Sequence, residues 1–239
     1  MRAGLLLFIA LAALPASGAE PETLHLVTED IAPINMAGPN VGEVRGIATE
    51  VIEKALAEYK IPYTISIESW PRAYDMALHG HNTCVYSTSR SEDRAPLFKW
   101  VGPVIRDRWV LFGRIDGPAP ASLDDVRGHA IGGHYNGAAT LYLKERGFSI
   151  DEESDFHASM NRVVARQLDY AVSGLLVGAY AISHDKDLDD IVPVLAFKDS
   201  ILYLACNKSV PDHVVEQLNA SVARMVADGT VAAITRRYQ

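Results

Sequence analysis

Cysteine is scarce in this chain of 239 residues, which contains only Cys84 and Cys206. Neither directly follows the apolar N-terminal run, which argues against a lipid-anchored form. Long apolar runs are missing further along, because residues 163–182 are interrupted by Arg166 and Asp169, and we expect no later segment to span a bilayer. Positively charged residues are also few: the chain has 22 lysines and arginines and 30 acidic residues, which gives a formal net charge of -8. That sign argues against nucleic acid and anionic membrane surfaces as partners.

Several motifs of catalytic and nucleotide-binding proteins are absent as well. The chain has no G-x-S-x-G nucleophile motif, no phosphate-binding P-loop and no dinucleotide-binding glycine pattern. His79 and His81, with Cys84 nearby, are a candidate site for a soft metal, but a spacing of two at a helix end does not place both imidazoles on one face. We therefore predict neither a metal nor a cofactor, and no catalytic constellation.

The first residues predict an exported protein. Met1 and Arg2 give a positive start, residues 5–14 are uncharged and apolar, and the small residues at 17–19 suit a signal peptidase. We expect a signal peptide at 1–19, cleaved near Ala19, and in a Gram-negative host a periplasmic mature chain. That chain, of about 220 residues, suits one large domain or two small ones.

The apolar pattern predicts alternating strands and helices. Strands are expected at 24–28, 63–67, 83–86, 130–133, 170–172 and 202–205, an extended segment at 104–112, and helices at 46–59, 71–79, 138–146, 159–167, 175–182, 211–228 and 230–238. Between the last two helices, Gly229 is expected to end one and Thr230 to cap the next. Repeated β-α-β units imply a mostly parallel sheet with helices on its faces. The economical interpretation is two α/β units, the second inserted into the first.

The segment 70–94 is the most informative stretch for function. It predicts a short amphipathic helix, a short apolar strand and then a hydroxyl-rich loop in which Ser87 and Ser89 precede Arg90 and Arg94. A guanidinium offers a planar fork of donors to a carboxylate, and small hydroxyls beside it can satisfy the remaining lone pairs. The segment therefore indicates an anion or carboxylate site. The alternative is a surface loop with solvated arginines.

The order of several short motifs carries a resemblance to a known family. The motifs are V-T-E-D-x-x-P at 27–33, G-I-A at 46–48, S-E-D-R at 91–94, G-P-V at 102–104, L-D-D-V-R-G at 123–128, the glycine-containing loop at 132–137, L-D-Y-A-V at 168–172 and D-G-T at 228–230. In this order they resemble the family-3 extracellular solute-binding proteins, the periplasmic receptors of polar amino-acid importers. The resemblance implies an α/β, periplasmic binding protein-like fold of type II, with two α/β lobes joined by a two-strand hinge and the ligand enclosed between them.

The resemblance also implies where the lobes and the hinge lie. Residues 20–105 and 201–239 would form lobe 1, and residues 106–200 would form the inserted lobe 2. The chain would cross between the lobes near 105–109 and near 199–202. Trp100 and Trp109 flank the first crossing, and we expect both to pack rather than to bind ligand.

Site residues carried over from the family fall mainly in the segment 70–94. Arg94 matches the arginine that grips the ligand carboxylate in the resembling receptors, and Ser87 and Ser89 fall in the preceding loop that also faces the ligand. Trp70 and Tyr135 are expected as the groups that stack on the ligand, and His134, in the loop of the second lobe, could contact it.

Several residues are candidates for the negative partner of a ligand ammonium. In the resembling receptors an acidic residue follows the strand predicted at 170–172, and here the chain has Ser173 and Gly174. Glu29, Asp30 or Glu50 could supply the charge instead, and of these we expect Glu29 to contact the ligand. A ligand that has a carboxylate but no ammonium remains an alternative to a free amino acid.

The resemblance implies a binding protein rather than an enzyme. The expected function is a monomeric receptor that captures a small polar, carboxylate-bearing solute and delivers it to the membrane subunits of an ABC importer. Two alternatives stay open: an enzyme on the same architecture, similar to the cyclohexadienyl dehydratases, and a periplasmic sensor component. The absence of an evident acid–base pair beside Arg94 favours binding.

The two cysteines complete the expectations from the resemblance. In the resembling fold, the strands that carry Cys84 and Cys206 are neighbours in one sheet, which makes a disulfide plausible in an oxidising compartment. The alternative is a pair of buried thiols, because directly opposed residues in a sheet often have poor disulfide geometry.

Overall fold

The computed structural model describes residues 22–238, so the expected signal peptide at 1–19 lies outside the described residues. The strands are β1 (Leu24–Thr28), β2 (Met36–Ala37), β3 (Val44–Arg45), β4 (Tyr63–Ile67), β5 (Thr83–Ser89), β6 (Lys99–Arg114), β7 (Ile131–His134), β8 (Ile150–Glu153), β9 (Tyr170–Gly174) and β10 (Ile191–Cys206). The helices are α1 (Ile47–Glu58), α2 (Trp70–His79), α3 (Ala138–Glu145), α4 (Phe156–Val164), α5 (Leu175–His184), α6 (Asp212–Ala227) and α7 (Thr230–Arg236), with short 3-10 helices η1 (Leu123–Val126) and η2 (Lys186–Leu188). Within the described chain, no helix is both long and apolar enough to cross a bilayer.

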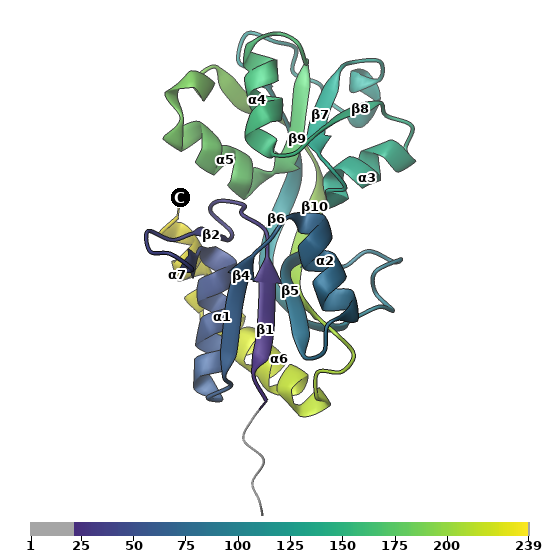
Figure 1. Cartoon of the computed structure of the whole chain (residues 1–239). Coiled ribbons are helices and arrows are strands. Elements are labelled where there is room, and N and C mark those ends of the chain that lie inside the picture. The colour runs from purple at the N-terminus through teal and green to yellow at the C-terminus, as the bar shows by residue number, and fades with distance from the viewer. Residues whose placement is uncertain (1–21, 239) are drawn as a thin grey trace, which may run out of the picture.

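The chain folds into two α/β lobes joined by two long strands (Figure 1). The main sheet has eight strands in the order β4-β1-β5-β10-β6-β9-β7-β8. Strands β4, β1 and β5 pair in parallel in one lobe, as do β8, β7 and β9 in the other. The expected parallel sheet therefore holds within each lobe. Between them, β6 and β10 pair antiparallel, because both long strands run from one lobe to the other in opposite directions.

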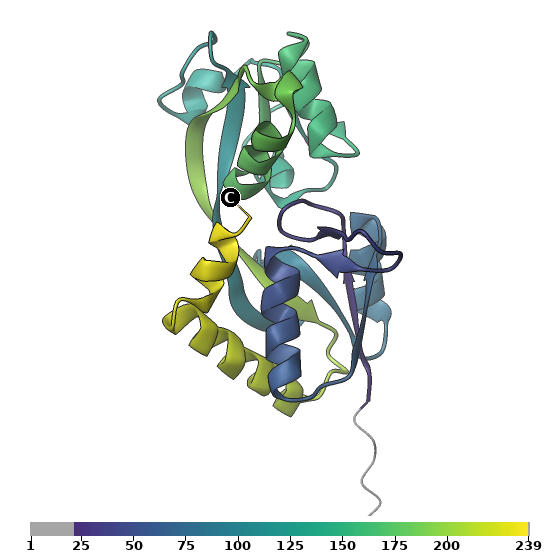
Figure 2. The same ribbon diagram turned by 90° about the vertical axis from the view of Figure 1, so that its left-hand side faces the viewer.

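Each lobe buries apolar side chains on both faces of its part of the sheet. In lobe 1, α1 and α6 cover one face through residues such as Ile52 and Leu218, while α2 covers the other through Ala73 and Ala77. In lobe 2, α4 and α5 lie on one face and α3 on the other. Figure 2 shows the same layering in lobe 1, with α1 and α6 on one side of the strands and α2 on the other. The helix periodicity explains this layering, since apolar residues spaced three or four apart form one face of each helix.

The hinge consists of the middle portions of β6 and β10. Ile105 pairs with Leu202 and Asp107 with Ser200, so both expected crossings lie side by side in one antiparallel ladder. The lobe boundaries predicted at 105/106 and 200/201 both fall inside these strands. The exact residues at which the chain passes from lobe to lobe stay a prediction.

Several element boundaries differ from those predicted. Strand β10 begins at Ile191, well before the predicted start at 202, because a proline, two charged residues and several register shifts hide its alternation. Strand β8 was not predicted at all, since its sequence Ile-Asp-Glu-Glu has low strand propensity. Gly229, in the left-handed region with φ 82°, is itself the N-cap of α7, so the prediction that Thr230 caps the helix was wrong.

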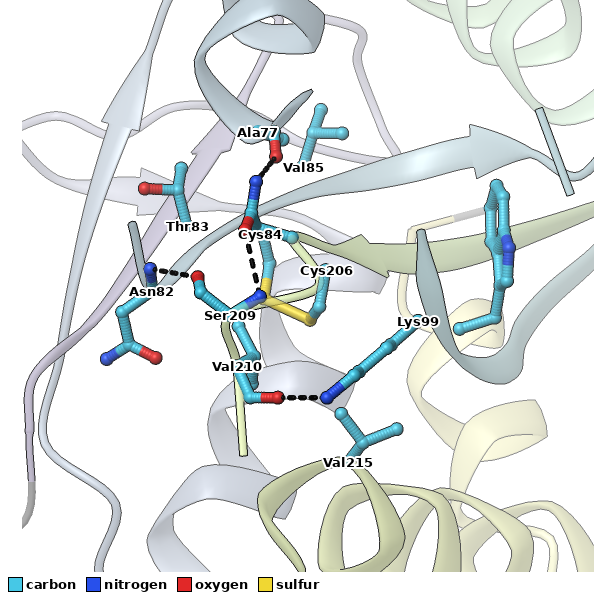
Figure 3. The surroundings of a disulfide bond; sticks show 12 residues. Ala77, Asn82, Thr83, Cys84, Val85, Lys99, Cys206, Ser209, Val210 and Val215 are labelled. Atoms are coloured by element: carbon cyan, nitrogen blue, oxygen red, sulfur yellow. Dashed lines mark hydrogen bonds between the residues drawn. A yellow bond between two sulfur atoms is a disulfide. The ribbon is translucent and has the colours of Figure 1, made fainter. Parts of the chain in front are cut away.

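The structure joins Cys84 and Cys206 in a disulfide (Figure 3). The two residues face one another directly across β5 and β10, and both side chains are fully buried. Nearby, the Asn82 backbone N–H donates to Ser209 Oγ at 2.9 Å, and Lys99 Nζ donates to the Val210 carbonyl at 2.7 Å. The bond closes a loop of sequence separation 122 that contains the whole of lobe 2. It therefore fixes the returning strand to lobe 1.

Candidate functional site

A cleft of about 1010 Å³ lies between the lobes. All six residues predicted to bind ligand line it: Arg94, Ser87, Ser89, Trp70, Glu29 and Tyr135. Their roles in binding stay predictions, but the fold brings them to one place. The first five come from lobe 1, and Tyr135 follows β7 in lobe 2 and is 51% exposed.

Arg94 is the buried cation of this cleft. Its side chain leaves the residue only 8% exposed, and its guanidinium carbon lies 5.5 Å from the centre of the Trp70 ring and 5.3 Å from that of Tyr74. These aromatic faces hold the guanidinium by cation–π attraction. Within residues 22–238, it forms no ion pair with an acidic side chain. Arg90, in contrast, is exposed and lies over Trp100, outside the residues that line the cleft.

The serines lie on β5 and not in a loop, so the predicted end of that strand at residue 86 was wrong. A bulge explains their position: Tyr86 and Ser87 together oppose the single residue Leu204 of β10, and Ser87 has a φ of 61°. A bulge turns a side chain away from the regular alternation of the strand. The Ser87 hydroxyl thereby donates to the side-chain oxygen of buried Asn35, whose amide in turn donates to the Glu29 carbonyl.

The loop that follows β1 is held by the start of α1. The backbone N–H of Ala48 donates to the Ile34 carbonyl at 2.9 Å. Gly46, with φ 127°, permits this close approach, because a Cβ there would lie 2.5 Å from the Ile34 oxygen. This packing fixes the loop that carries Glu29 against the cleft.

Glu29 meets His134 across the cleft. Glu29 follows β1 in lobe 1, His134 ends β7 in lobe 2, and their nearest side-chain atoms, Oε2 and Nε2, are 3.6 Å apart. That separation is too long for a hydrogen bond but would allow an ion pair. Burial acts against the ion pair, because it raises the pKa of Glu29 to about 8 and lowers the pKa of His134. Near pH 7 we therefore describe the two groups as a neutral acid and a neutral imidazole.

This burial predicts a pH-dependent stability that Glu29→Gln removes. The folded-state pKa of Glu29, about 8, exceeds its ordinary value of 4.5, so the folded state binds the proton more tightly. The stability is fully present below pH 4.5 and falls as the pH rises toward 8, by at most about 1.4 kcal/mol per pH unit. Chemical denaturation of both proteins between pH 5 and 8.5 measures the difference. Parallel curves for wild type and variant would contradict it.

Other residues of the cleft were not predicted as ligand-binding groups. Asp107 and Trp109 enter from the hinge strand β6, and His157 and His184 from lobe 2. Trp109 packs against Tyr142 and Phe197, as expected, but it also lines the cleft. Asp107 and Trp109 reach the cleft through the long-range pairing of β6 with β10 and β9, which no local pattern reveals.

Two of the weaker candidates lie elsewhere. Glu50 is hydrogen-bonded to the Tyr238 hydroxyl at 2.6 Å and paired with Arg237, and it does not line the cleft, so its suggested role toward the ligand was wrong. His79 and His81 pair with separate acidic residues at 3.0 and 2.8 Å. Among the described residues, no group of three histidine, cysteine or acidic side chains is arranged to hold a metal ion.

Several solved structures have a fold similar to that of this chain. A histidine kinase sensor domain with similarity to periplasmic binding proteins superposes with a TM-score of 0.82 at 21% identity, covering 90% of this chain and 95% of that one. The amino acid ABC transporter substrate-binding protein AbpA from Streptococcus pneumoniae, bound to L-arginine, gives 0.78 at 15%, covering 90% and 94%. The GluR0 ligand-binding core from Nostoc punctiforme in complex with L-glutamate gives 0.78 at 14%, covering 90% and 98%.

These similarities define a class of fold. The chain has a periplasmic binding protein-like fold, in which two α/β lobes are joined by two strands. No protein-family model and no curated protein matches the sequence, so membership of family 3 stays a prediction. Because this architecture occurs in importer receptors and in a sensor domain, the fold alone does not choose between those functions.

Proposed function

We propose that this protein is a periplasmic receptor that captures a small polar, carboxylate-bearing solute between its lobes and delivers it to an ABC importer. The observation that carries the proposal is Arg94, a buried guanidinium without an acidic partner in the described chain, in a cleft lined from both lobes. The amino-acid-binding proteins among the structural neighbours support the same class of ligand.

Electrostatics favours an acidic ligand for this cleft. A buried cation is costly unless an anion accompanies it, because the protein interior solvates charge poorly. Trp70 and Tyr74 compensate Arg94 only in part, because cation–π attraction leaves its planar donors unused. A ligand carboxylate would take up these donors in a bidentate pair, with Ser89 on β5 as a neighbouring hydroxyl.

The hinge would let the two lobes move apart to admit the solute and then close over it. Only β6 and β10 connect the lobes within the described sheet, so small changes in their backbone angles would move one lobe as a body. A ligand that contacts both lobes stabilises the closed arrangement by its differential affinity for it. An importer can then recognise the closed form.

A thermal-shift screen tests the proposal. We expect at least one member of a panel of L-amino acids and organic acids to raise the melting temperature, by roughly 5 to 10 °C at a concentration 100-fold above its Kd. Amines that lack a carboxylate are expected to have no comparable effect. A protein that responds only to such amines, or to no compound in the panel, would contradict a carboxylate-binding receptor.

One observation favours an enzyme as a second candidate. Glu29 lies 3.6 Å from His134 in the same cleft as Arg94, and burial raises the pKa of Glu29 to about 8, and a general acid works best when its pKa is near the working pH. Such a pair could protonate a leaving group on a bound acid, as in a dehydration. Incubation with prephenate, followed by chromatography, separates the candidates: the receptor proposal expects no product, whereas turnover that disappears in Glu29→Gln would establish the enzyme.

A further inference from the structure

One acidic side chain of the cleft has no part in the carboxylate clamp. Asp107 lies on the hinge strand β6 and lines the cleft. The other acids there differ from it: burial raises the pKa of Glu29 to about 8, Glu68 pairs with Arg72 at 2.7 Å, Asp155 accepts the 2.8 Å hydrogen bond that caps α4, and Asp30 is exposed. Asp107 is therefore a partly buried carboxylate of the cleft that forms no ion pair with a cationic side chain among the described residues.

Backbone N–H groups, including two at the start of α5, surround the Asp107 carboxylate. Oδ1 accepts the Leu176 backbone N–H at 3.3 Å, at the start of α5. Within residues 22–238, Oδ2 receives no hydrogen bond from a side chain, and no lysine, arginine or histidine forms an ion pair with the carboxylate. Burial raises the pKa of Asp107, and the backbone N–H groups of Arg108, Leu176 and Leu175, together with the charge of the Arg108 side chain, oppose this rise. A cation beside Oδ2 would complete the stabilisation of its charge.

Gly174 provides the space for this carboxylate. It pairs with Trp109 across β9 and β6, and a Cβ on it would lie 2.4 Å from Asp107 Oδ2. Its backbone, with φ -68° and ψ 146°, is open to any residue, so the conformation does not require glycine. The requirement is the missing side chain, because any larger residue would push the Asp107 carboxylate out of its position in the cleft.

We propose that Asp107 binds the ammonium group of an α-amino acid whose carboxylate is held by Arg94, an inference that rests on the proposed function. The register of the sheet shows how Asp107 lies relative to Ser89, a cleft residue on the strand that leads to Arg94. Ser200 pairs with Asp107, while Leu202 pairs with Ser89, so Asp107 and Ser89 lie two strands apart across the sheet and two residues apart along it. Side chains reaching in from both positions leave between them the space that a small zwitterion needs.

Asp107→Asn separates this role from that of a helix cap. The amide oxygen of asparagine can still accept the Leu176 N–H, so the variant removes the charge and keeps the structural contact. A role limited to capping α5 would leave ligand discrimination unchanged. A role in binding an ammonium would change it, because hydrogen bonds to charged groups contribute more than neutral ones.

The experiment uses calorimetry with matched probes. Each L-amino acid that stabilises the wild type is compared with the corresponding acid in which hydrogen replaces the amino group. We expect Asp107→Asn to weaken binding of the amino acid about 10- to 100-fold and to leave the affinity for the desamino acid unchanged. Gly174→Ala is expected to weaken binding of the amino acid as well, because the added Cβ would displace the Asp107 carboxylate. Asp199→Asn, an exposed acid on the same hinge ladder, is the matched control and should bind like the wild type.

Four results would overturn the inference. Unchanged affinity of Asp107→Asn for the amino acid excludes a bound ammonium, and equal losses for both probes show a structural role. A wild type that binds organic acids but no amino acid overturns the ammonium site while the proposed function stands. A wild type that binds neither class overturns both.

Discussion

Replacing Arg94 by alanine is expected to weaken binding of the solute about 30-fold or more while the protein remains folded. The truncation leaves a buried ligand carboxylate without its partner, which costs about 2 to 5 kcal/mol. The fold should survive, because the guanidinium stacks on Trp70 and Tyr74 and forms no ion pair in the described chain. Calorimetry with the best compound of the thermal-shift screen measures the loss, and circular dichroism checks the fold.

Two further variants make the Arg94 result specific. Arg94→Lys keeps the charge but loses the planar fork, so we expect an affinity between those of wild type and Arg94→Ala. Arg90→Ala removes an exposed guanidinium that lies over Trp100 and outside the cleft, and we expect wild-type affinity. Equal effects of Arg90→Ala and Arg94→Ala would indicate a general influence of surface charge and contradict the clamp.

Removing the disulfide is expected to lower the free energy of unfolding by about 4 to 5 kcal/mol in the chain-entropy model. The bond between Cys84 and Cys206 closes a loop of sequence separation 122. In this model, a cross-link that closes a longer loop removes more conformational entropy from the unfolded chain. For a domain of this size the melting temperature should fall by about 10 to 15 °C. The double variant Cys84→Ala, Cys206→Ala is the best comparison, since alanine places no polar group in the buried site.

A reductant provides the control for the disulfide. Reduction should destabilise the wild type by a similar amount and leave the double variant unchanged. Alkylation of denatured, unreduced wild type gives an independent measurement by mass spectrometry. Two modified thiols in protein purified from the periplasm would show that the bond does not form there.

The sequence predicted best what neighbouring residues decide. Arg94, Ser87, Ser89 and Trp70 come from one continuous segment, in which a helix and a strand lead directly to the cleft. Glu29 follows β1, and because β1 and β5 are parallel neighbours, their ends meet at the same edge of the sheet. Such a juxtaposition follows from strand order, which alternating helices and strands indicate.

What the sequence did not predict depends on contacts between distant segments. The hinge strand β10 is hidden by bulges, so nothing local shows that Ser200 lies beside Asp107. The sequence has no acidic residue at Ser173 or Gly174, where the resemblance implies one. In the structure, the Asp107 carboxylate, from another strand, lies beside Gly174. The contact of Glu29 with His134 forms between lobes, and its burial depends on how closely they approach.

The central claim is that a solute closes the two lobes over Arg94. Small-angle X-ray scattering on the ligand-free protein and on protein saturated with the most stabilising compound of the panel tests it directly. We expect the radius of gyration to decrease with the compound in the wild type and to stay constant in Arg94→Ala. Identical scattering of the wild type with and without saturating compound would contradict capture by lobe closure.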